Sequence, residues 1–455
     1  MRCCRVKTKP FIILSIIVTA IVLFFVFYKG PIVVPDDYPT IQEAVDAALP
    51  GDKIFVKKGV YNESVLIDST KNNIKIIAKG KDVVIDGTGI GTFGFLLINN
   101  TNVKISGFKI TNHSIGILLE NTFGCTINNN KISSMSSFGI LMNDSIENTI
   151  VKNQLSESLI GMVSEDCLHN KIYKNELFDN EENGIVVNMS HNEIISSNKI
   201  YNNMESGIFS ELSTSIIKKN FIINNEINGI LLEQDQGAKI IKNKIQSNNG
   251  DGIRVTDNSS GTSMVNNAIK GNTHGIFIES AVSTLIRDNK IYKNSSDGIN
   301  IETPINYIAN NKIYKNCGNG IFGATDAVNT SVHKNKIYSN AQNGIYINGD
   351  TNTINKNNII KNRRNGILIG ENSDSNAITK NKLIKNQDDG IQVDGDRNTL
   401  KRNNSLKNED VGISINGDDN IITNNKSLKN GMLDIQDAGA GNTFKDNKYK
   451  TGNLP

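Results

Sequence analysis

The fold is decided by a six-residue motif, seen first as Asn289-Lys290-Ile291-Tyr292-Lys293-Asn294 and again, 22 residues later, as Asn311-Lys312-Ile313-Tyr314-Lys315-Asn316. In each copy an Ile stands between polar residues and an Asn closes either end. Apolar and polar residues that alternate over two to four positions are typical of very short β-strands. Asn favours turns, so the motif predicts strands separated by tight bends.

A Gly followed by Ile, Met or Phe recurs with the same period. Its successive intervals are all 22 to 24 residues, and a fixed period of this length indicates a solenoid. Leucine-rich repeats share the period but need a framework of Leu, which is absent. The recurring glycines are Gly94, Gly116, Gly139, Gly161, Gly184, Gly207, Gly229, Gly252, Gly275, Gly298, Gly320, Gly344, Gly366, Gly390 and Gly412.

Three short strands in each period, stacked in parallel, predict an all-β, right-handed parallel β-helix of about 15 regular turns. Gly and Asn are expected to supply the left-handed backbone at the bends. Asn side chains at fixed phase are expected to stack as internal ladders. Composition agrees with a folded chain, because Ile is phased with Asn and only 7 of 455 residues are Pro. A net charge of +3 gives no reason to expect a nucleic-acid partner.

The two ends differ from the repeats. Thr40-Ile41-Gln42-Glu43 is a capping box that predicts a short helix through Ala48, covering the first turn. Residues 31–92 are therefore expected to form the cap and irregular first turns. Residues 93–455 are expected to hold the regular repeats and a C-terminal cap, as one continuous domain with 31–92.

The N-terminus predicts a membrane anchor. Residues 11–28 contain no charge and are long enough for a transmembrane helix, with a signal sequence as the alternative. Residues 1–10 carry basic side chains, which the positive-inside rule places in the cytoplasm. The rest of the chain is then exported, to the cell surface or a periplasm. Its cysteines, Cys125, Cys167 and Cys317, are odd in number and widely spaced, so they predict buried thiols and no disulfide framework.

The segment 35–47, with Gly51-Asp52 and Gly59-Val60-Tyr61-Asn62-Glu63, resembles the start of pectin-lyase-like β-helix proteins. The repeats resemble those of NosD-type and of carbohydrate-binding and sugar-hydrolase β-helix proteins. The resemblance covers about residues 31–455 and implies the fold more than the function, because the superfamily includes lyases, hydrolases, esterases, epimerases and non-enzymatic surface proteins. Motifs of polygalacturonases and alginate epimerases are absent, and His and Met form no cluster with metal-ligand spacing.

One outward face is expected to combine acids with aromatic rings. If the residues one and three places after each Gly point inward, those two and four places after it point outward. Carboxylates there would accept bonds from sugar hydroxyls while rings stack on sugars. A bound divalent cation such as calcium would relieve the repulsion between acids, and the alternative is a plain solvated sheet. The candidates are Glu211, Glu233, Glu279, Glu302, Phe209, Phe277, Phe322 and Tyr346.

A second outward column carries Lys at eight turns, including Lys290, Lys312 and Lys336, with Tyr two residues later in several of them. Such a column either binds an anionic polymer or surface, or serves as a soluble covering of the sheet.

One local constellation suggests catalysis. The position before the recurring Gly is Asp251, His274 and Asp297 in three successive turns, and Arg254 lies nearby. A base beside an Arg suits proton abstraction from a uronate, whose carboxylate the Arg would neutralise. The alternative is a turn column in which any small polar residue fits.

These features predict a membrane-anchored, exported β-helix protein that binds polysaccharide or serves as a surface module. One alternative is a carbohydrate-active enzyme, either a lyase, a hydrolase or a uronate epimerase. A second is a NosD-like factor for the maturation of a metal site.

Overall fold

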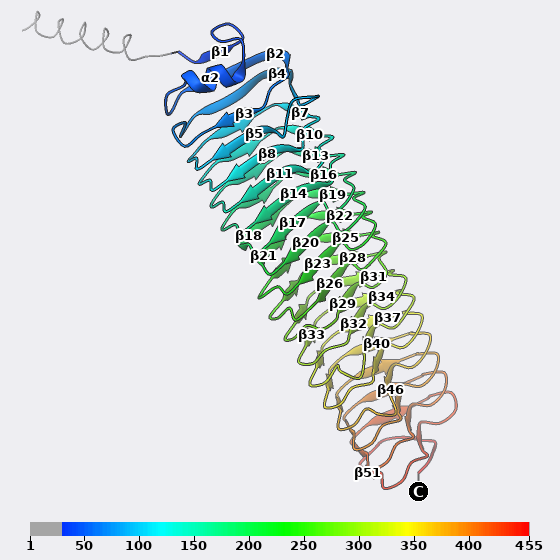
Figure 1. Cartoon of the computed structure of the whole chain (residues 1–455). Coiled ribbons are helices and arrows are strands. Elements are labelled where there is room, and N and C mark those ends of the chain that lie inside the picture. Colours follow the sequence, from blue (N-terminus) through cyan, green and yellow to red (C-terminus); the bar gives the residue numbers. More distant parts are fainter. Residues whose placement is uncertain (1–29, 455) are drawn as a thin grey trace, which may run out of the picture.

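The computed structural model describes residues 30–454 and shows an elongated solenoid of stacked parallel strands (Figure 1). It makes about 19 turns, a number that includes the irregular first turns. The all-β solenoid expected from the repeats is therefore confirmed. A regular turn contains three strands, for example β24 (Lys239–Ile241), β25 (Lys244–Gln246) and β26 (Ile253–Thr256).

Each regular strand pairs in parallel with the equivalent strand of the next turn. β24 pairs with β27 (Ser263–Val265), β25 with β28 (Ala268–Lys270), and β26 with β29 (Ile276–Ile278). We name the three columns of strands by these members: stack 1 contains β24 and β27, stack 2 contains β25 and β28, and stack 3 contains β26 and β29. These registers keep side chains of equal phase above one another from turn to turn.

The core is a set of aliphatic columns enclosed by the three stacks. Ile299 and Ile301, one and three places after Gly298, are 0% and 1% exposed. Ile291 and Ile313, the central residues of the repeated motif, are both fully buried. The predicted inward and outward alternation is therefore confirmed, and burial of these Ile columns is the main favourable term for folding.

The recurring Gly is required by close approach. A Cβ on Gly298 would lie 2.4 Å from Ile313 Cγ2 and 2.6 Å from the carbonyl oxygen of Gly320. Gly298 does not have a positive φ, whereas Lys293 and Lys315 both have φ 58°. The expectation that Gly and Asn supply left-handed backbone is confirmed at bends such as Gly237 and Asn310, but it does not hold for the recurring Gly. The repeat takes that conformation at the residue before Asn294 or Asn316.

Buried Asn side chains link one turn to the next, as predicted. Asn289 Nδ2 donates to Met264 O at 2.8 Å and to Asn311 Oδ1 at 3.1 Å. The backbone N–H of Asn289 also donates to Asn311 Oδ1, at 2.9 Å. Asn294 and Asn316 form a second ladder, in which the backbone N–H and Nδ2 of Asn294 both donate to Asn316 Oδ1. These bonds satisfy bend groups that burial would otherwise leave without partners.

Three carboxylic acids stand where the ladders otherwise use neutral side chains. Burial raises the pKa of each to about 7: Glu193, Asp235 and Asp389. Glu193 Oε1 accepts two bonds from Asn170, at 3.0 and 3.1 Å, while its other oxygen is buried without a partner. Asp235 has the same arrangement, with one oxygen bonded to the backbone N–H of Ser213.

The N-terminal end is covered by a helix, as predicted. α2 (Ile41–Ala47) begins after Thr40, whose hydroxyl accepts from the backbone N–H of Glu43 at 3.1 Å. The Glu63 carboxylate accepts from the first two helical N–H groups, at 3.0 and 2.9 Å. This gives the Gly59–Glu63 motif a structural role, because an anion at a helix N-terminus is stabilising. Figure 1 shows α2 lying across the first turns.

The first turns are irregular, as expected. β1 (Ile32–Val34) pairs with the start of β2 (Lys53–Tyr61), which pairs in turn with the long β4 (Lys75–Asp86). β3 (Val65–Ile67) begins stack 3. The register of β2 against β4 shifts between Lys57 and Gly59.

The predicted basic tail (1–10) and membrane anchor (11–28) lie outside the described residues. Within residues 30–454, no helix combines the length and the apolarity needed to cross a membrane. Cys125 and Cys167 are buried, which raises the pKa of each thiol to about 11. The prediction of a buried thiol is wrong for Cys317, which is exposed because it lies in the bend after stack 2.

Candidate functional site

The outward side chains of stack 3 form the candidate face predicted from the repeats. Phe277 lies on β29, and Phe322 lies on β35 (Ile321–Gly323), where its ring centroid is 5.4 Å from that of Tyr346. Both Phe rings are partly buried by their neighbours on the face. Phe209 occupies the same phase on β20 (Ile208–Glu211).

The predicted acids lie at the ends of the same strands. Glu211 pairs in register with Glu233 of β23 (Ile230–Glu233), so their carboxylates stand in adjacent turns. Burial, then the charges of Asp257 and Glu211, raises the pKa of Glu233. Glu279 and Glu302 occupy the equivalent position after later strands.

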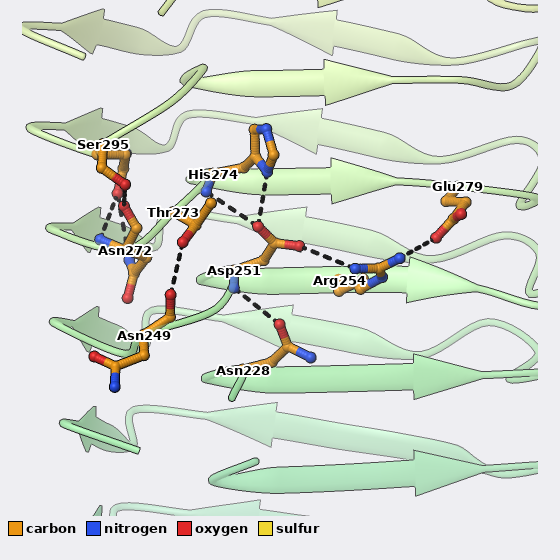
Figure 2. Close-up of polar contacts among 10 residues, drawn as sticks. Asn228, Asn249, Asp251, Arg254, Asn272, Thr273, His274, Glu279 and Ser295 are labelled. Carbon is orange, nitrogen blue, oxygen red and sulfur yellow. Dashed lines mark hydrogen bonds and ion pairs between the residues drawn. The ribbon is translucent and has the colours of Figure 1, made fainter. Parts of the chain in front are cut away.

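A compact polar cluster centres on Asp251 and His274, in the bends that lead into β26 and β29 (Figure 2). Asp251 Oδ1 lies 2.8 Å from His274 Nδ1 and accepts from the backbone N–H of His274 at 3.0 Å. The Asp251 backbone N–H donates to Asn228 Oδ1 at 2.8 Å, which ties the Asp251 backbone to the preceding turn. The Asp251 side chain is 5% exposed and that of His274 is 19% exposed.

Arg254 joins this cluster from β26. Its guanidinium lies 3.7 Å from Asp251 Oδ2, forms an ion pair with Glu279, and lies 4.8 Å from the ring centroid of Phe277. The His274 ring is 5.2 Å from that of Phe277. Two carboxylates, a guanidinium, an imidazole and an aromatic ring thus meet on one face of two adjacent turns, as Figure 2 shows for the charged members.

Asp297 takes another direction. Its Oδ1 accepts a bond from the side chain of Asn319 at 3.0 Å and another from the Asn319 backbone, toward the following turn. Burial raises the pKa of Asp297. Of the four predicted catalytic residues, the structure brings Asp251, Arg254 and His274 into contact, while Asp297 bonds away from the imidazole.

The arrangement is suited to acid–base chemistry. Asp251 bonded to Nδ1 orients the imidazole so that Nε2 is the ring nitrogen left to act on a ligand. Within residues 30–454, no side chain or backbone group bonds to Nε2. Arg254 is the cation of the cluster, and its guanidinium already pairs with Asp251 and Glu279, so a ligand carboxylate would have to compete with them.

The same face is hollowed three turns further along. The hollow has a volume of about 300 Å³ and is lined by Tyr346, Leu368, Glu371 and Asp394, among others. The sequence predicted Tyr346 but missed Leu368 and Glu371. The available signal was spacing, because the interval from Gly366 to Gly390 is 24 residues and its extra residues fall in the bend that contains Glu371.

Among residues 30–454, no group of three or more His, Cys, Asp and Glu side chains converges in a way that could hold a metal ion. Within the described residues, Glu211 and Glu233 are therefore not joined by a third such side chain, and the suggested cation stays a prediction. The scattered His residues equally give no support to metal-site maturation.

Three comparisons place the chain among known proteins. A cell surface glycoprotein of Methanothermus fervidus is 33% identical over 99 residues, which covers 21% of this chain and 16% of that protein. The aligned part thus spans about a sixth of the relative's length.

Among solved structures, the mannuronan C-5 epimerase AlgE6 A-module of Azotobacter vinelandii has 13% identity, a TM-score of 0.33, and coverage of 91% of this chain and 94% of that one. DFA-IIIase of Arthrobacter chlorophenolicus A6 has 10% identity and a TM-score of 0.42, over 67% of this chain and 92% of that one. At such identities and TM-scores nothing about function follows.

A family model described as a right handed beta helix region matches residues 93–236, 228–383 and 324–453. Together the matches cover most of the chain and agree with the stacked turns of the structure. None of these relatives is of the NosD type, so that finer resemblance remains a prediction. The chain belongs to the right-handed β-helix family.

Proposed function

We propose that this is an exported surface protein that binds polysaccharide on the outward face of stack 3. The observation that carries the proposal is the cluster in which Arg254, Phe277 and Glu279 lie beside the Asp251–His274 pair, in the same two turns. Elsewhere on the face, single acids and rings recur in even columns. Within the described residues, this is the only place where a guanidinium, carboxylates, an imidazole and an aromatic ring contact one another.

The chemistry of the cluster fits a sugar polymer. An aromatic ring offers an apolar surface on which a sugar ring stacks, and carboxylates accept bonds from its hydroxyls. The hollow beside Tyr346 lies on the same face, three turns away along the axis. A chain molecule lying along the solenoid would reach both places, whereas a small ligand would reach one.

Export to the cell surface is part of this proposal. It is supported by the uncharged segment 11–28, whose length suits a membrane anchor. It is also supported by the relative that is named a cell surface glycoprotein, although the similarity is confined to 99 residues.

The binding proposal predicts that a Phe277→Ala, Arg254→Gln variant loses retention on an immobilised polysaccharide that holds the wild type. The expected loss is about tenfold or more in affinity, because a stacking surface and a charged donor are removed together. The measurement is affinity electrophoresis of the full chain in detergent, through gels that contain neutral or uronate polysaccharides.

A matched control is Phe221→Ala, which removes a partly buried ring that lies against Lys244 on stack 2. This control should be retained like the wild type. The proposal is wrong if no polysaccharide in the panel retains the wild type. It is also wrong if the Phe277→Ala, Arg254→Gln variant is retained as strongly as the wild type and the Phe221→Ala control.

A carbohydrate-active enzyme is the second candidate, and the Asp251–His274 hydrogen bond favours it. An imidazole held by a buried carboxylate is a suitable general base. For this candidate, His274→Gln is expected to abolish the release of unsaturated products or reducing ends while leaving polysaccharide retention in place. Wild-type protein that retains a polysaccharide but never cleaves or epimerises it would exclude the enzyme and leave the binding protein.

A further inference from the structure

Acidic side chains gather on one edge of the C-terminal half of the solenoid. The edge consists of the bends that join stack 3 to stack 1, in residues 324–330, 348–352, 370–376, 394–398 and 416–420. Each bend carries at least one acid, such as Asp326, Glu371 or Asp419, all exposed. The one basic residue in these five bends is Arg397, and an ion pair with Asp374 neutralises it. We name these bends the acidic edge.

Stack 2 carries the opposite charge over the same turns. Its strands and the adjoining bend residues fall in segments 310–316, 334–339, 356–363, 380–386 and 402–408, in which every charged residue is Lys or Arg. The nearest exposed acids, Asp388 and Glu409, follow the last two segments in the bend that leads to stack 3. We name these segments the basic face. The net charge of +3 is therefore the sum of two long surfaces with opposite charge and of the rest of the chain.

The basic face is ordered by stacked rings. Tyr292 of β31 (Lys290–Tyr292), Tyr314 of β34 (Lys312–Tyr314) and Tyr338 of β37 (Lys336–Tyr338) lie 5.0 and 4.8 Å apart, within 2° of parallel. The Lys residues of the same strands pair in register, so their charges repeat with each turn.

These Lys charges have no acid to neutralise them. Among the ion pairs within residues 30–454, none involves Lys290, Lys312 or Lys336. Like charges at equivalent positions of neighbouring strands repel one another. A row of negative charges with the same spacing would therefore be attracted along its whole length.

The two surfaces face away from each other. The acidic edge leads into stack 1, and in Figure 1 the stack 1 strands β18 (His191–Ser196) and β21 (Thr214–Lys218) lie along one margin. The stack 2 strands β19 (Lys199–Tyr201) and β22 (Phe221–Ile223) lie along the opposite margin. Both surfaces are also hollowed at the same turns. The hollow beside Lys361 and Arg363 has a volume of about 510 Å³, and the one beside Glu371 has a volume of about 300 Å³.

We propose that copies of this chain associate side by side, with the basic face of one against the acidic edge of the next. A second copy fits the basic face because its acidic edge has the same turn spacing, the same extent along the axis and the opposite sign. The contact joins two different surfaces on opposite sides, so it does not close on itself and builds an open row of parallel solenoids. This goes beyond polysaccharide binding and does not depend on it.

The attraction is electrostatic and repeated. Each exposed ion pair contributes little by itself, but five successive turns act together on a rigid scaffold. Screening weakens such contacts as salt rises. Association is therefore expected at about 20 mM salt and is expected to disappear at about 500 mM.

The test uses two charge-reversal variants of the full chain in detergent, measured by sedimentation velocity. One is Lys312→Glu, Lys336→Glu, Lys361→Glu, and the other is Asp326→Lys, Glu371→Lys, Asp419→Lys. The first variant halves the formal charge of the basic face, from +12 to +6, and the second nearly neutralises the acidic edge, from −7 to −1. Each variant alone should therefore associate less than the wild type at low salt. An equimolar mixture of the two should recover association, because the intact acidic edge of the first variant meets the intact basic face of the second.

Restoration by mixing separates the proposal from misfolding, because two misfolded variants would not rescue each other in a salt-dependent way. A wild type that stays monomeric at low salt overturns the proposal. So does a mixture that stays monomeric although both variants keep the circular dichroism of the wild type. If the wild type is monomeric but binds dextran sulfate, and only the lysine variant loses that binding, the basic face takes a polyanion and the proposal is wrong.

Discussion

A Gly298→Val variant is expected to lower the free energy of unfolding by about 3 kcal/mol. The first added atom, Cβ, would lie 2.4 Å from Ile313 Cγ2 and 2.6 Å from the carbonyl oxygen of Gly320. Neither neighbour yields easily, because one is a packed core methyl and the other belongs to the backbone of the next turn. The measurement is the urea midpoint of the full chain in detergent, followed by far-ultraviolet circular dichroism.

Gly237→Ala is the matched control. A Cβ there meets nothing within 4 Å, although the positive φ of 72° makes the residue mildly strained, at about 1 kcal/mol. The two variants therefore separate crowding from backbone conformation. If both shift the midpoint equally, close approach is not why Gly recurs in every turn.

The second large effect is a loss of stability between about pH 4 and pH 7. Glu193 has an ordinary pKa near 4.5 and a pKa of about 7 in the fold, because burial disfavours its charge. Below pH 4 the carboxyl is protonated in both states and carries no penalty. As the pH rises toward 7 the unfolded chain ionises while the folded chain holds the proton, so the free energy of unfolding falls. Above pH 7 the loss is complete.

At about 1.4 kcal/mol for each pKa unit, the loss for Glu193 alone is roughly 3 kcal/mol. Glu193→Gln is expected to recover most of it at neutral pH and to change nothing at pH 4, because the amide resembles the protonated acid. Asp235→Asn should behave in the same way. Glu157→Gln, at an exposed bend position, is the control and should follow the wild type at every pH. A Glu193→Gln variant with the pH dependence of the wild type would show that this carboxyl does not govern it.

Much of the fold is predictable because every repeat contains the complete sequence pattern of one turn. The capping box at Thr40, the inward Ile at 291 and 313, and the Asn ladders all follow from local pattern, and the structure confirms them. The pattern does not reveal how closely the backbones of successive turns approach one another. The role of Gly298 depends on the backbone of Gly320, which lies one turn away and has no local signature.

The candidate site is predictable in part. Phase alone placed Asp251 and His274 in adjacent turns, and the hydrogen bond between them follows from that stacking. Asp297 shares the phase, but its Oδ1 accepts the bonds that Asn319 donates, because each side chain in this column has neighbours both above and below. The position of a residue within the repeat does not determine whether its side chain bonds to the turn above or to the turn below. Glu371 was missed because it belongs to an extended bend, where the period no longer fixes direction.

The Asn ladders also make each turn depend on its neighbours. The backbone N–H of Asn289 is satisfied only when Asn311 of the following turn is in place, and that of Asn311 waits in turn for Asn335. In the two Asn ladders each turn thus completes the donors of the turn before it, whereas in the column of Asn228 and Asn319 the donors reach back to the preceding turn. An inner turn therefore needs a neighbour on each side to satisfy its ladder groups, and α2 takes the place of the missing neighbour at the N-terminal end.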